Sequence, residues 1–154
     1  MARALEEILT PAPAKPELRA PSAEARLNID VVFTSMEATA AALQQAAEMA
    51  SRLAARITLV APQVVPHPLP LERPPVLLEW NERRLRAIAE ESPVETRVQI
   101  YLCRDPVRTL CAALKPHSVV VVGGRKRWWC PAWEGKLSRV LRRAGHAVIF
   151  AEAE

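Results

Sequence analysis

Short apolar stretches alternate with amphipathic stretches over most of the chain. Five of the apolar stretches have the length and the Val- and Ile-rich composition of strands, and they are residues 29–33, 56–61, 94–103, 118–122 and 147–151. Between them, apolar residues recur every three or four positions, which is the period of a helix that packs on a sheet. The alternation predicts an α/β protein.

Local signals mark the ends of the predicted helices. We expect Thr34 and Glu37 to form a capping box at the start of the first helix. Pro74-Pro75 is expected to start the second helix, and Asp105-Pro106 combines an N-cap with a proline in the first turn of the third. Gly145 is expected to end the fourth helix.

The order of these elements predicts how they pack. Strands joined by right-handed helical crossovers form a parallel sheet with helices on both faces. We therefore expect a doubly wound, Rossmann-like or flavodoxin-like sheet of five strands in the order 3-2-1-4-5. Residues 94–103 alternate between apolar and polar side chains, which favours a half-exposed strand at an edge of the sheet.

Prolines divide the chain into an arm and a single domain. Pro11, Pro13, Pro16 and Pro21 lie in an N-terminal arm, residues 1–27, which we expect to be extended and partly polyproline II. Residues 28–154 form the α/β domain. Six further prolines, between positions 62 and 75, fill one internal loop of that domain.

Charge and cysteine content indicate where the basic residues lie and which cellular compartment the protein occupies. The net charge is +4, and residues 125–143 contain seven basic residues and one acidic residue, so the positive charge belongs to one region. The three cysteines form no C-x-x-C pair, which favours a reducing compartment. The sequence shows no signal peptide and no apolar run of about 18 residues. We expect a cytoplasmic protein, with attachment to the periphery of a membrane complex left open.

Residues 123–136 form what we call the tryptophan loop. It holds three of the four tryptophans and three of the four glycines of the chain. Its indoles can fill a pocket of the same chain, or the loop can dock a protein partner, because Trp and Arg are enriched at interface hot spots. A third possibility is contact with an anionic membrane surface. The candidate partner-binding residues in this stretch are Arg125, Arg127, Trp128, Trp129 and Trp133.

The Ala-rich first helix, the Asp-Pro start of the third helix and the Val-rich strand that ends in Gly123 make residues 28–152 resemble the universal stress protein family. In that family an Asp after the first strand contacts adenine, and a Gly, two residues, Gly, nine residues, Gly and Ser or Thr pattern wraps the phosphates. Thr34 stands in the Asp position here. Gly123 matches the first Gly, Lys126 replaces the second, and Gly135-Lys136 follows after eight residues instead of nine.

These departures predict a degenerate nucleotide site. Thr34 supplies no carboxylate, and Lys126 brings a side chain to a place where the family presents bare backbone. If binding of ATP or AMP is retained, the resemblance assigns it to Thr34, Ser35, Gly123, Gly124, Lys126, Gly135 and Lys136. The family also often dimerises through its last strand, which points to Val148 and Phe150 as a pairing edge.

Neither an enzyme site nor a metal site is apparent. His67, His117 and His146 lack Cys or carboxylate neighbours at ligand spacing, and no activated nucleophile motif is present. Aromatic and basic residues in the tryptophan loop would suit single-stranded nucleic acid, but no recognised motif supports it, so we expect no nucleic acid partner.

Taken together, these observations predict a non-catalytic regulatory or accessory subunit. We expect it to act through protein contacts made by the tryptophan loop, the N-terminal arm and the last strand, without a cofactor. The alternative is a universal stress protein that binds ATP or AMP as a nucleotide sensor.

Overall fold

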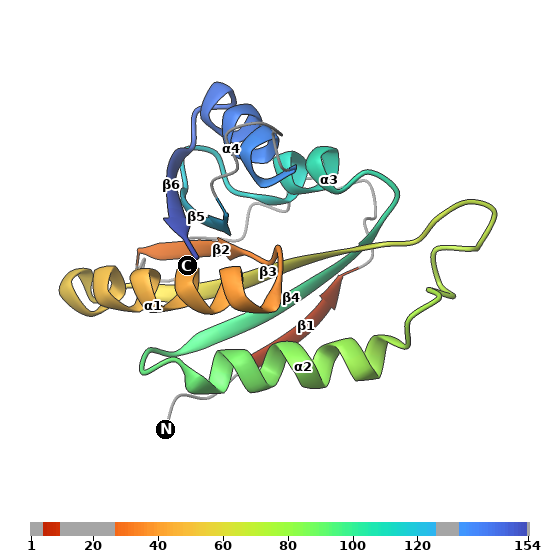
Figure 1. Ribbon diagram of the computed structural model, residues 1–154, viewed down its shortest axis with the longest axis horizontal. Helices are drawn as coiled ribbons and strands as arrows, with labels where there is room; N and C mark the ends of the chain where they lie inside the picture. The colour runs from red at the N-terminus through yellow and green to blue at the C-terminus, as the bar shows by residue number, and fades with distance from the viewer. Residues whose placement is uncertain (1–4, 10–26, 126–132, 154) are drawn as a thin grey trace, which may run out of the picture.

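The computed structural model describes residues 5–9, 27–125 and 133–153. A parallel sheet forms the centre, with two helices on each face (Figure 1). The strands are β1 (Leu5–Leu9), β2 (Asn28–Val32), β3 (Arg56–Val64), β4 (Thr96–Cys103), β5 (Val119–Gly124) and β6 (Ala147–Glu152). The helices are α1 (Met36–Leu53), α2 (Leu78–Glu91), α3 (Pro106–Ala113) and α4 (Trp133–Arg143).

The sheet contains the five predicted strands in the predicted order. Its full order is β1-β4-β3-β2-β5-β6, and the strands from β4 to β6 reproduce the expected 3-2-1-4-5 arrangement. Every pair of neighbouring strands is parallel. This part of the topology agrees with the right-handed crossover rule and with the alternation of strands and helices in the sequence.

A sixth strand comes from the N-terminal arm, which the sequence predicted to be extended and assigned to no strand of the sheet. β1 pairs with β4 in parallel, from Leu5 opposite Arg97 to Leu9 opposite Tyr101. The prediction that β4 lies at an edge is therefore wrong, because β4 has β3 on one side and β1 on the other. The alternation of apolar and polar residues in β4 indicates that one face of the strand is more buried than the other. This pattern does not depend on whether the backbone of the strand is paired on one side or on both.

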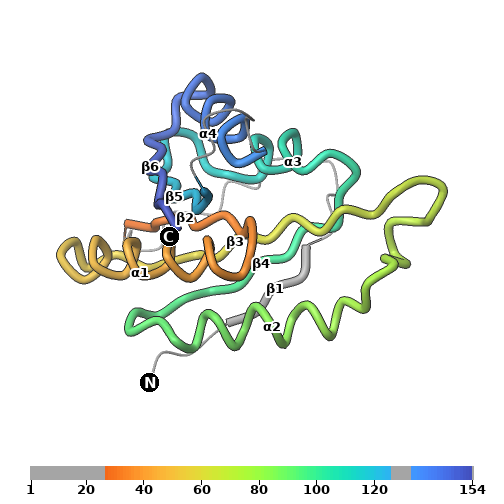
Figure 2. The backbone as a smooth tube through the Cα atoms, in the orientation of Figure 1, coloured from red at the N-terminus to blue at the C-terminus, as the bar shows by residue number. Residues whose placement is uncertain are grey.

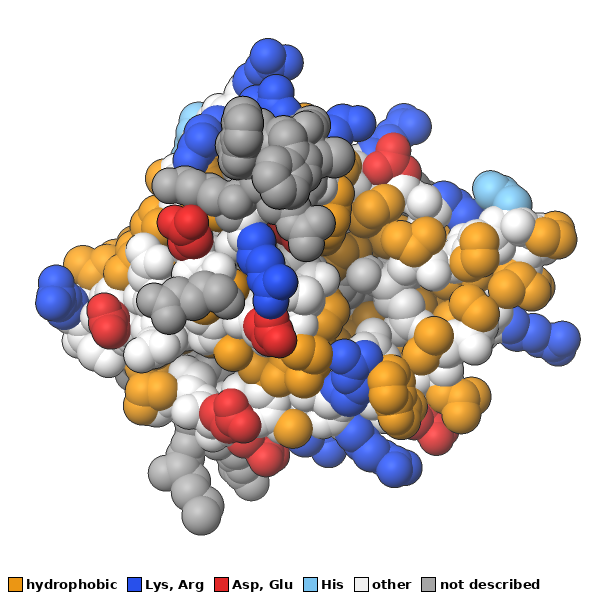
Figure 3. Space-filling model, viewed as in Figure 1, with side chains coloured by type: hydrophobic (Ala, Val, Ile, Leu, Met, Phe, Trp, Pro, Cys, Tyr) orange, Lys and Arg blue, Asp and Glu red, His pale blue; other side chains and the backbone are white. Residues whose placement is uncertain are grey.

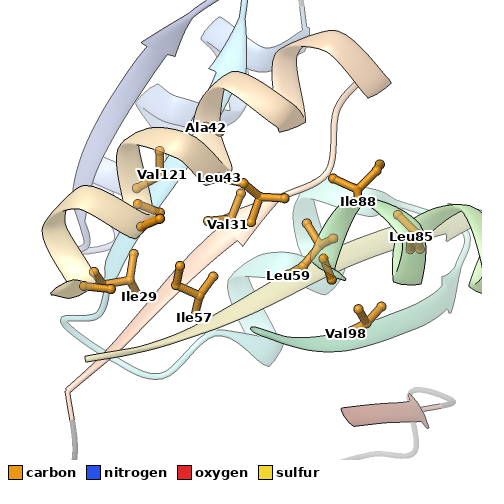
Figure 4. Packing of buried hydrophobic residues seen from close by; sticks show 14 of the residues in the cluster. Ile29, Val31, Ala42, Leu43, Ile57, Leu59, Leu85, Ile88, Val98 and Val121 are labelled. Atoms are coloured by element: carbon orange, nitrogen blue, oxygen red, sulfur yellow. The ribbon is translucent and has the colours of Figure 1, made fainter. Parts of the chain in front are cut away.

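Two hydrophobic clusters cover the two faces of the sheet. On one face, α1 packs mainly on β2, β5 and β6 and α2 packs on β4, with Leu43 and Leu85 directed at strand residues such as Val31 and Leu59 (Figure 4). On the other face, Leu110 of α3 and Leu137 of α4 pack with residues of β2, β3 and β5. None of the described helices is long and apolar enough to cross a membrane.

The start of α1 differs from the predicted capping box. Its N-cap is Ser35, whose hydroxyl accepts a hydrogen bond from the backbone N–H of Ala38 at 3.3 Å. Thr34, the expected N-cap, lies one residue earlier and points to β5 instead. Both residues carry the hydroxyl that an N-cap needs, so the sequence alone does not choose between them.

The other helix boundaries follow their signals more closely. Asp105 caps α3 by accepting from the N–H of Arg108, and Gly145 adopts a φ of 95° after α4. α2 begins at Leu78 and not at the predicted Pro74-Pro75, which lies within the preceding loop. The stripe of Leu85, Ile88 and Ala89 is buried as expected.

The proline-rich loop between β3 and α2 runs outward from the sheet (Figure 2). Gln63 fixes its base, because its amide donates to the carbonyl of Val76 at 3.0 Å and accepts from Asn81 at 3.0 Å. Arg104 adds a hydrogen bond to the carbonyl of Val65 at 2.7 Å. Side-chain hydrogen bonds thus hold both ends of the loop against β3, α2 and the end of β4.

A buried polar network lies near the amino end of β2. Asn28 donates to the carboxylate of Asp30 at 2.8 Å and accepts from the hydroxyl of Thr58 at 2.8 Å. Ser118 lies beside the same carboxylate and contacts Nδ1 of His146 at 3.0 Å. Burial raises the pKa of Asp30 to about 6, although the hydrogen bonds and the charge of Lys115 act in the opposite direction.

Replacing Asp30 with Asn tests the cost of this buried carboxyl. The pKa of Asp30 is about 6 in the native state, against 3.8 for an ordinary Asp in the unfolded chain. The native state therefore keeps this proton up to a higher pH, and the free energy of unfolding decreases as the pH rises from about 4 to about 6. The loss is about 3 kcal/mol at most for this shift. We expect Asp30→Asn to abolish this loss and to be more stable than the wild type at pH 7.

Urea denaturation between pH 4 and pH 8 measures the effect. Glu90→Gln removes an exposed carboxylate of α2 and serves as the control. If Asp30→Asn and the wild type show the same pH dependence, the carboxyl of Asp30 is not held in its protonated form by burial.

Candidate functional site

The candidate site lies at the carboxyl ends of β2 and β5, at the position of the crevice in which open α/β sheets bind ligands, and we call this region the crevice. These strands are neighbours, and the chain leaves β2 for α1 on one face of the sheet and β5 for α4 on the other. Such a switch point is where ligands bind in open α/β sheets. The structure brings together Thr34, Ser35, Gly123, Gly124 and Arg125 at this point, as the sequence predicted.

Thr34 joins the two sides of the crevice. Its hydroxyl donates to the carbonyl oxygen of Gly123 at 2.7 Å, and its backbone N–H donates to the hydroxyl of Thr39 at 3.2 Å. The side chain that stands in the adenine-contacting position is thus engaged within the chain. An incoming ligand would have to replace the contact with Gly123, and a lost hydrogen bond to a partly buried carbonyl is unfavourable.

The end of β5 lies directly against the first turn of α1. A Cβ at Gly123 would lie 2.6 Å from the carbonyl carbon of Ala38 and would overlap its oxygen. A Cβ at Gly124 would lie 2.8 Å from the ring of Phe150 and 3.1 Å from Cβ of Glu134. Gly123 is therefore required for packing against α1, whereas a side chain at Gly124 would displace the ring of Phe150. The glycines of the motif match do not by themselves indicate an open phosphate cradle.

An ion pair spans the entrance of the crevice. Arg125, which follows β5, donates to the carboxylate of Glu37 in the first turn of α1. The side chains are 53% and 72% exposed, so solvent screens their attraction and the pair contributes little to stability. The pair nevertheless occupies Arg125, a predicted partner-binding residue. Sequence reasoning missed it because the two residues are 88 positions apart.

The start of α4 carries an acidic group where the family pattern places phosphate. Glu134 lies in the first turn, and its Oε2 is buried without a hydrogen-bond partner in the described part of the chain. A carboxylate at this position repels a phosphate that approaches the same helix end. Gly135 faces open space and Lys136 is exposed, so a basic group is also present nearby.

Much of the tryptophan loop lies outside the described residues. This applies to Lys126, Arg127, Trp128 and Trp129. Trp133, the first residue of α4, is 37% exposed. The prediction that the loop docks a partner remains a prediction.

β6 forms one edge of the described sheet, as expected. The backbone N–H groups of Ala147 and Ala153 donate to the β5 side of the sheet, at Ser118 and Gly124. Because successive residues of a strand point to opposite sides, the N–H groups of Val148 and Phe150 point to the open edge. The two predicted pairing residues therefore present donors that a further strand would need.

The cysteines and histidines form no reactive centre in the described structure. Cys103 is buried and Cys111 is half-buried, and burial raises the pKa of both thiols. A thiol with a raised pKa is a weaker nucleophile at neutral pH. Within the described ranges, no group of three or more His, Cys, Asp or Glu side chains is placed to hold a metal ion.

Exposed apolar side chains gather on the proline-rich loop and the start of α2, a surface that sequence reasoning did not single out (Figure 3). Leu69, Val76, Leu77 and Trp80 are between 38% and 73% exposed. Arg84 lies over the indole of Trp80, 4.5 Å from the ring centroid. A separate groove of about 540 Å³ lies between α1 and α2, lined by residues such as Gln44, Glu48 and Pro93.

Comparison with solved structures identifies the fold. A universal stress protein family member from Burkholderia pseudomallei superposes with a TM-score of 0.53 at 18% identity, over 80% of this chain and 93% of that chain. Universal stress protein UspA from Lactobacillus plantarum gives a TM-score of 0.46 at 17% identity, over 82% of this chain and 99% of that chain. No family model and no curated protein matches the sequence.

Replacing Gly123 and replacing Gly135 with Ala are expected to have opposite effects on the stability of the domain. Gly123→Ala places a methyl group on the backbone of Ala38, which cannot move without shifting α1. We expect a loss of about 3 kcal/mol. Gly135→Ala adds a methyl group in open space inside α4, where we expect unchanged stability or a gain of up to about 1 kcal/mol.

Urea denaturation of the two variants and the wild type measures these differences. Gly135→Ala is the matched control, because it makes the same chemical change at another glycine of the same loop. Equal stabilities of the two variants would mean that β5 does not approach α1 as closely as described.

Proposed function

We propose that this chain, which has the fold of universal stress proteins, is a non-catalytic regulatory or accessory subunit that acts through protein contacts. The observation that carries the proposal is the hydrogen bond from Thr34 to the carbonyl of Gly123. It joins the two sides of the crevice in which proteins of similar architecture bind ligands.

Several backbone groups around the crevice already form hydrogen bonds within the chain, which supports this proposal. The carbonyl of Gly124 accepts from Ala153 at 3.0 Å, and the N–H of Thr39 donates to the carbonyl of Ser35 at 2.9 Å. The hydroxyl of Ser35 already accepts a hydrogen bond from the N–H of Ala38. Phosphate sites in such folds depend on free backbone N–H groups at a helix start, and at α1 part of that set is occupied by the chain itself.

Backbone donors at the β6 edge and side chains of the tryptophan loop favour association with another protein. At the β6 edge, Val148 and Phe150 offer backbone donors to a further strand. The tryptophan loop contains three indoles and several basic residues within one short segment of the sequence, and such residues dominate binding energy at interfaces. The N-terminal arm provides a third contact.

The alternative function is a nucleotide sensor that binds ATP or AMP. Exposed Lys136 near the start of α4 is the observation in its favour, because a lysine there can attract phosphate. The carboxylate of Glu134 beside it opposes this binding. We therefore rank the alternative second.

Calorimetric titration with ATP and with AMP separates the two functions. We expect no binding at micromolar concentrations, because the hydroxyls of Thr34 and Ser35 are engaged within the chain and the carboxylate of Glu134 lies at the start of α4. Lys136→Glu tests any binding that is seen, with Arg139→Glu as the control on the exposed side of the same helix. Micromolar binding that Lys136→Glu abolishes and Arg139→Glu preserves would refute the proposed function in favour of the sensor.

Removal of two indoles tests the tryptophan loop. If the loop docks a partner, Trp128→Ala combined with Trp129→Ala releases a protein that co-purifies from native cells, because the central apolar anchors are lost. Trp80→Ala removes an exposed tryptophan outside the loop and is expected to retain that protein.

Urea denaturation checks that each variant remains folded. A double variant that unfolds at the wild-type urea concentration and still retains its partner would contradict a docking role for the loop. Release by Trp80→Ala alone would move the docking surface to the proline-rich loop.

A further inference from the structure

A groove separates α1 from α2 on one face of the sheet. The two helices lie side by side over different strands, because α1 packs mainly on β2, β5 and β6 and α2 packs on β4 (Figure 1). The groove between them has a volume of about 540 Å³, within the range of about 300 to 1,000 Å³ that is typical of binding clefts. It is therefore large enough to accept side chains of another molecule.

The floor of this groove, which we call the α1–α2 groove, is apolar. Leu43 and Ala47 of α1 and Ile88 of α2 line it and are buried. Leu43 and Ile88 come from the two helices and lie between them (Figure 4). The α1 wall extends from Ala40 to Ser51, which is about 16 Å, or about three turns, at the rise of a helix. The small side chains along this wall allow another helix to approach closely.

The rim of the α1–α2 groove is acidic. Glu48 of α1 and Glu91 of α2 line it from its two sides, are exposed, and have no hydrogen-bond or ion-pair partner within the described residues. None of the described residues that line the groove is a Lys or Arg. Arg84, one turn before Ile88, lies over the indole of Trp80. The groove is therefore negative in a chain whose net charge is +4.

We propose that the α1–α2 groove binds a basic amphipathic helix of a partner protein. Apolar side chains at helical spacing would enter the floor, as in other complexes in which a helix lies in a groove. Lys or Arg on the flanks of that helix would pair with Glu48 and Glu91 and fix its position. An acidic helix would be repelled by the same two carboxylates.

The charge and shape of the groove favour a different protein over a second copy of this chain. The basic helix of the chain itself is α4, but Leu137 and Leu141 on its apolar face are already packed on the sheet. A second copy therefore has no free apolar face on α4 to place in the groove. The inference goes beyond the contacts proposed for the tryptophan loop, the N-terminal arm and β6.

Titration of the full chain with a labelled synthetic peptide tests the groove. The probe is a helical peptide of about three turns with Leu along one face and Lys on both flanks, and the comparison peptide has Glu in place of every Lys. Fluorescence anisotropy measures binding at low and at high salt. We expect the Lys peptide to bind at micromolar concentrations and to bind more weakly as the salt concentration rises, because exposed ion pairs are screened. We expect no binding of the Glu peptide.

Charge-reversal variants locate the binding site. Glu48→Lys combined with Glu91→Lys is expected to weaken binding of the Lys peptide by about tenfold or more, because two attractive pairs become repulsive. Glu79→Lys combined with Glu90→Lys is the control, since it makes the same change in net charge at exposed positions that do not line the groove. This control is expected to keep nearly the wild-type affinity.

A variant that blocks the groove separates its shape from its charge. Gln44→Trp places a large side chain at an exposed position of the lining and leaves the net charge unchanged. We expect it to weaken binding of the Lys peptide as well. Urea denaturation checks that each variant remains folded.

Several results would overturn the inference. Equal loss of binding in the two charge-reversal variants would mean that the peptide responds to net charge and not to the groove. Binding of the Glu peptide as strong as that of the Lys peptide, or no binding of either, would also overturn it. So would a wild-type dimer in light scattering that Gln44→Trp dissociates, because a second copy would then cover the groove. These outcomes leave the contacts proposed for the tryptophan loop and β6 untouched, since none of the described lining residues belongs to either.

Discussion

The close approach of β5 to α1 is the constraint on which the candidate site depends. No side chain fits at Gly123, because the carbonyl of Ala38 occupies that space. The same approach places the carbonyl of Gly123 within reach of the Thr34 hydroxyl. Packing and hydrogen bonding therefore close the crevice together, and a ligand at the switch point would disturb both.

The two ends of the sheet carry different kinds of polar group. At the carboxyl end, hydroxyls and backbone groups pair with one another and remain uncharged, with the ion pair of Arg125 and Glu37 at the surface. At the amino end, Asp30 is buried among Asn28, Thr58 and Ser118, and burial raises its pKa to about 6. Charging of this carboxyl is unfavourable in the folded state, so the molecule retains a destabilising group away from the crevice.

The two edges of the described sheet come from opposite ends of the chain. β6 leaves the outward backbone donors of Val148 and Phe150 open, and β1 forms the other edge, where it covers the outward groups of β4. The N-terminal arm therefore contributes a strand to the sheet.

By itself, the sequence determined that strands and helices alternate, that helices cover both faces of the sheet and where the crevice lies, because apolar periodicity and crossover handedness are local or general constraints. It also determined that Thr34 lacks the carboxylate expected for adenine contact. Only the tertiary structure decided that Thr34 bonds to Gly123 and that Arg125 pairs with Glu37, since these partners lie 89 and 88 positions apart. The same holds for β1, because parallel pairing at an edge depends on backbone groups that every residue carries and leaves no distinctive side-chain pattern in five residues.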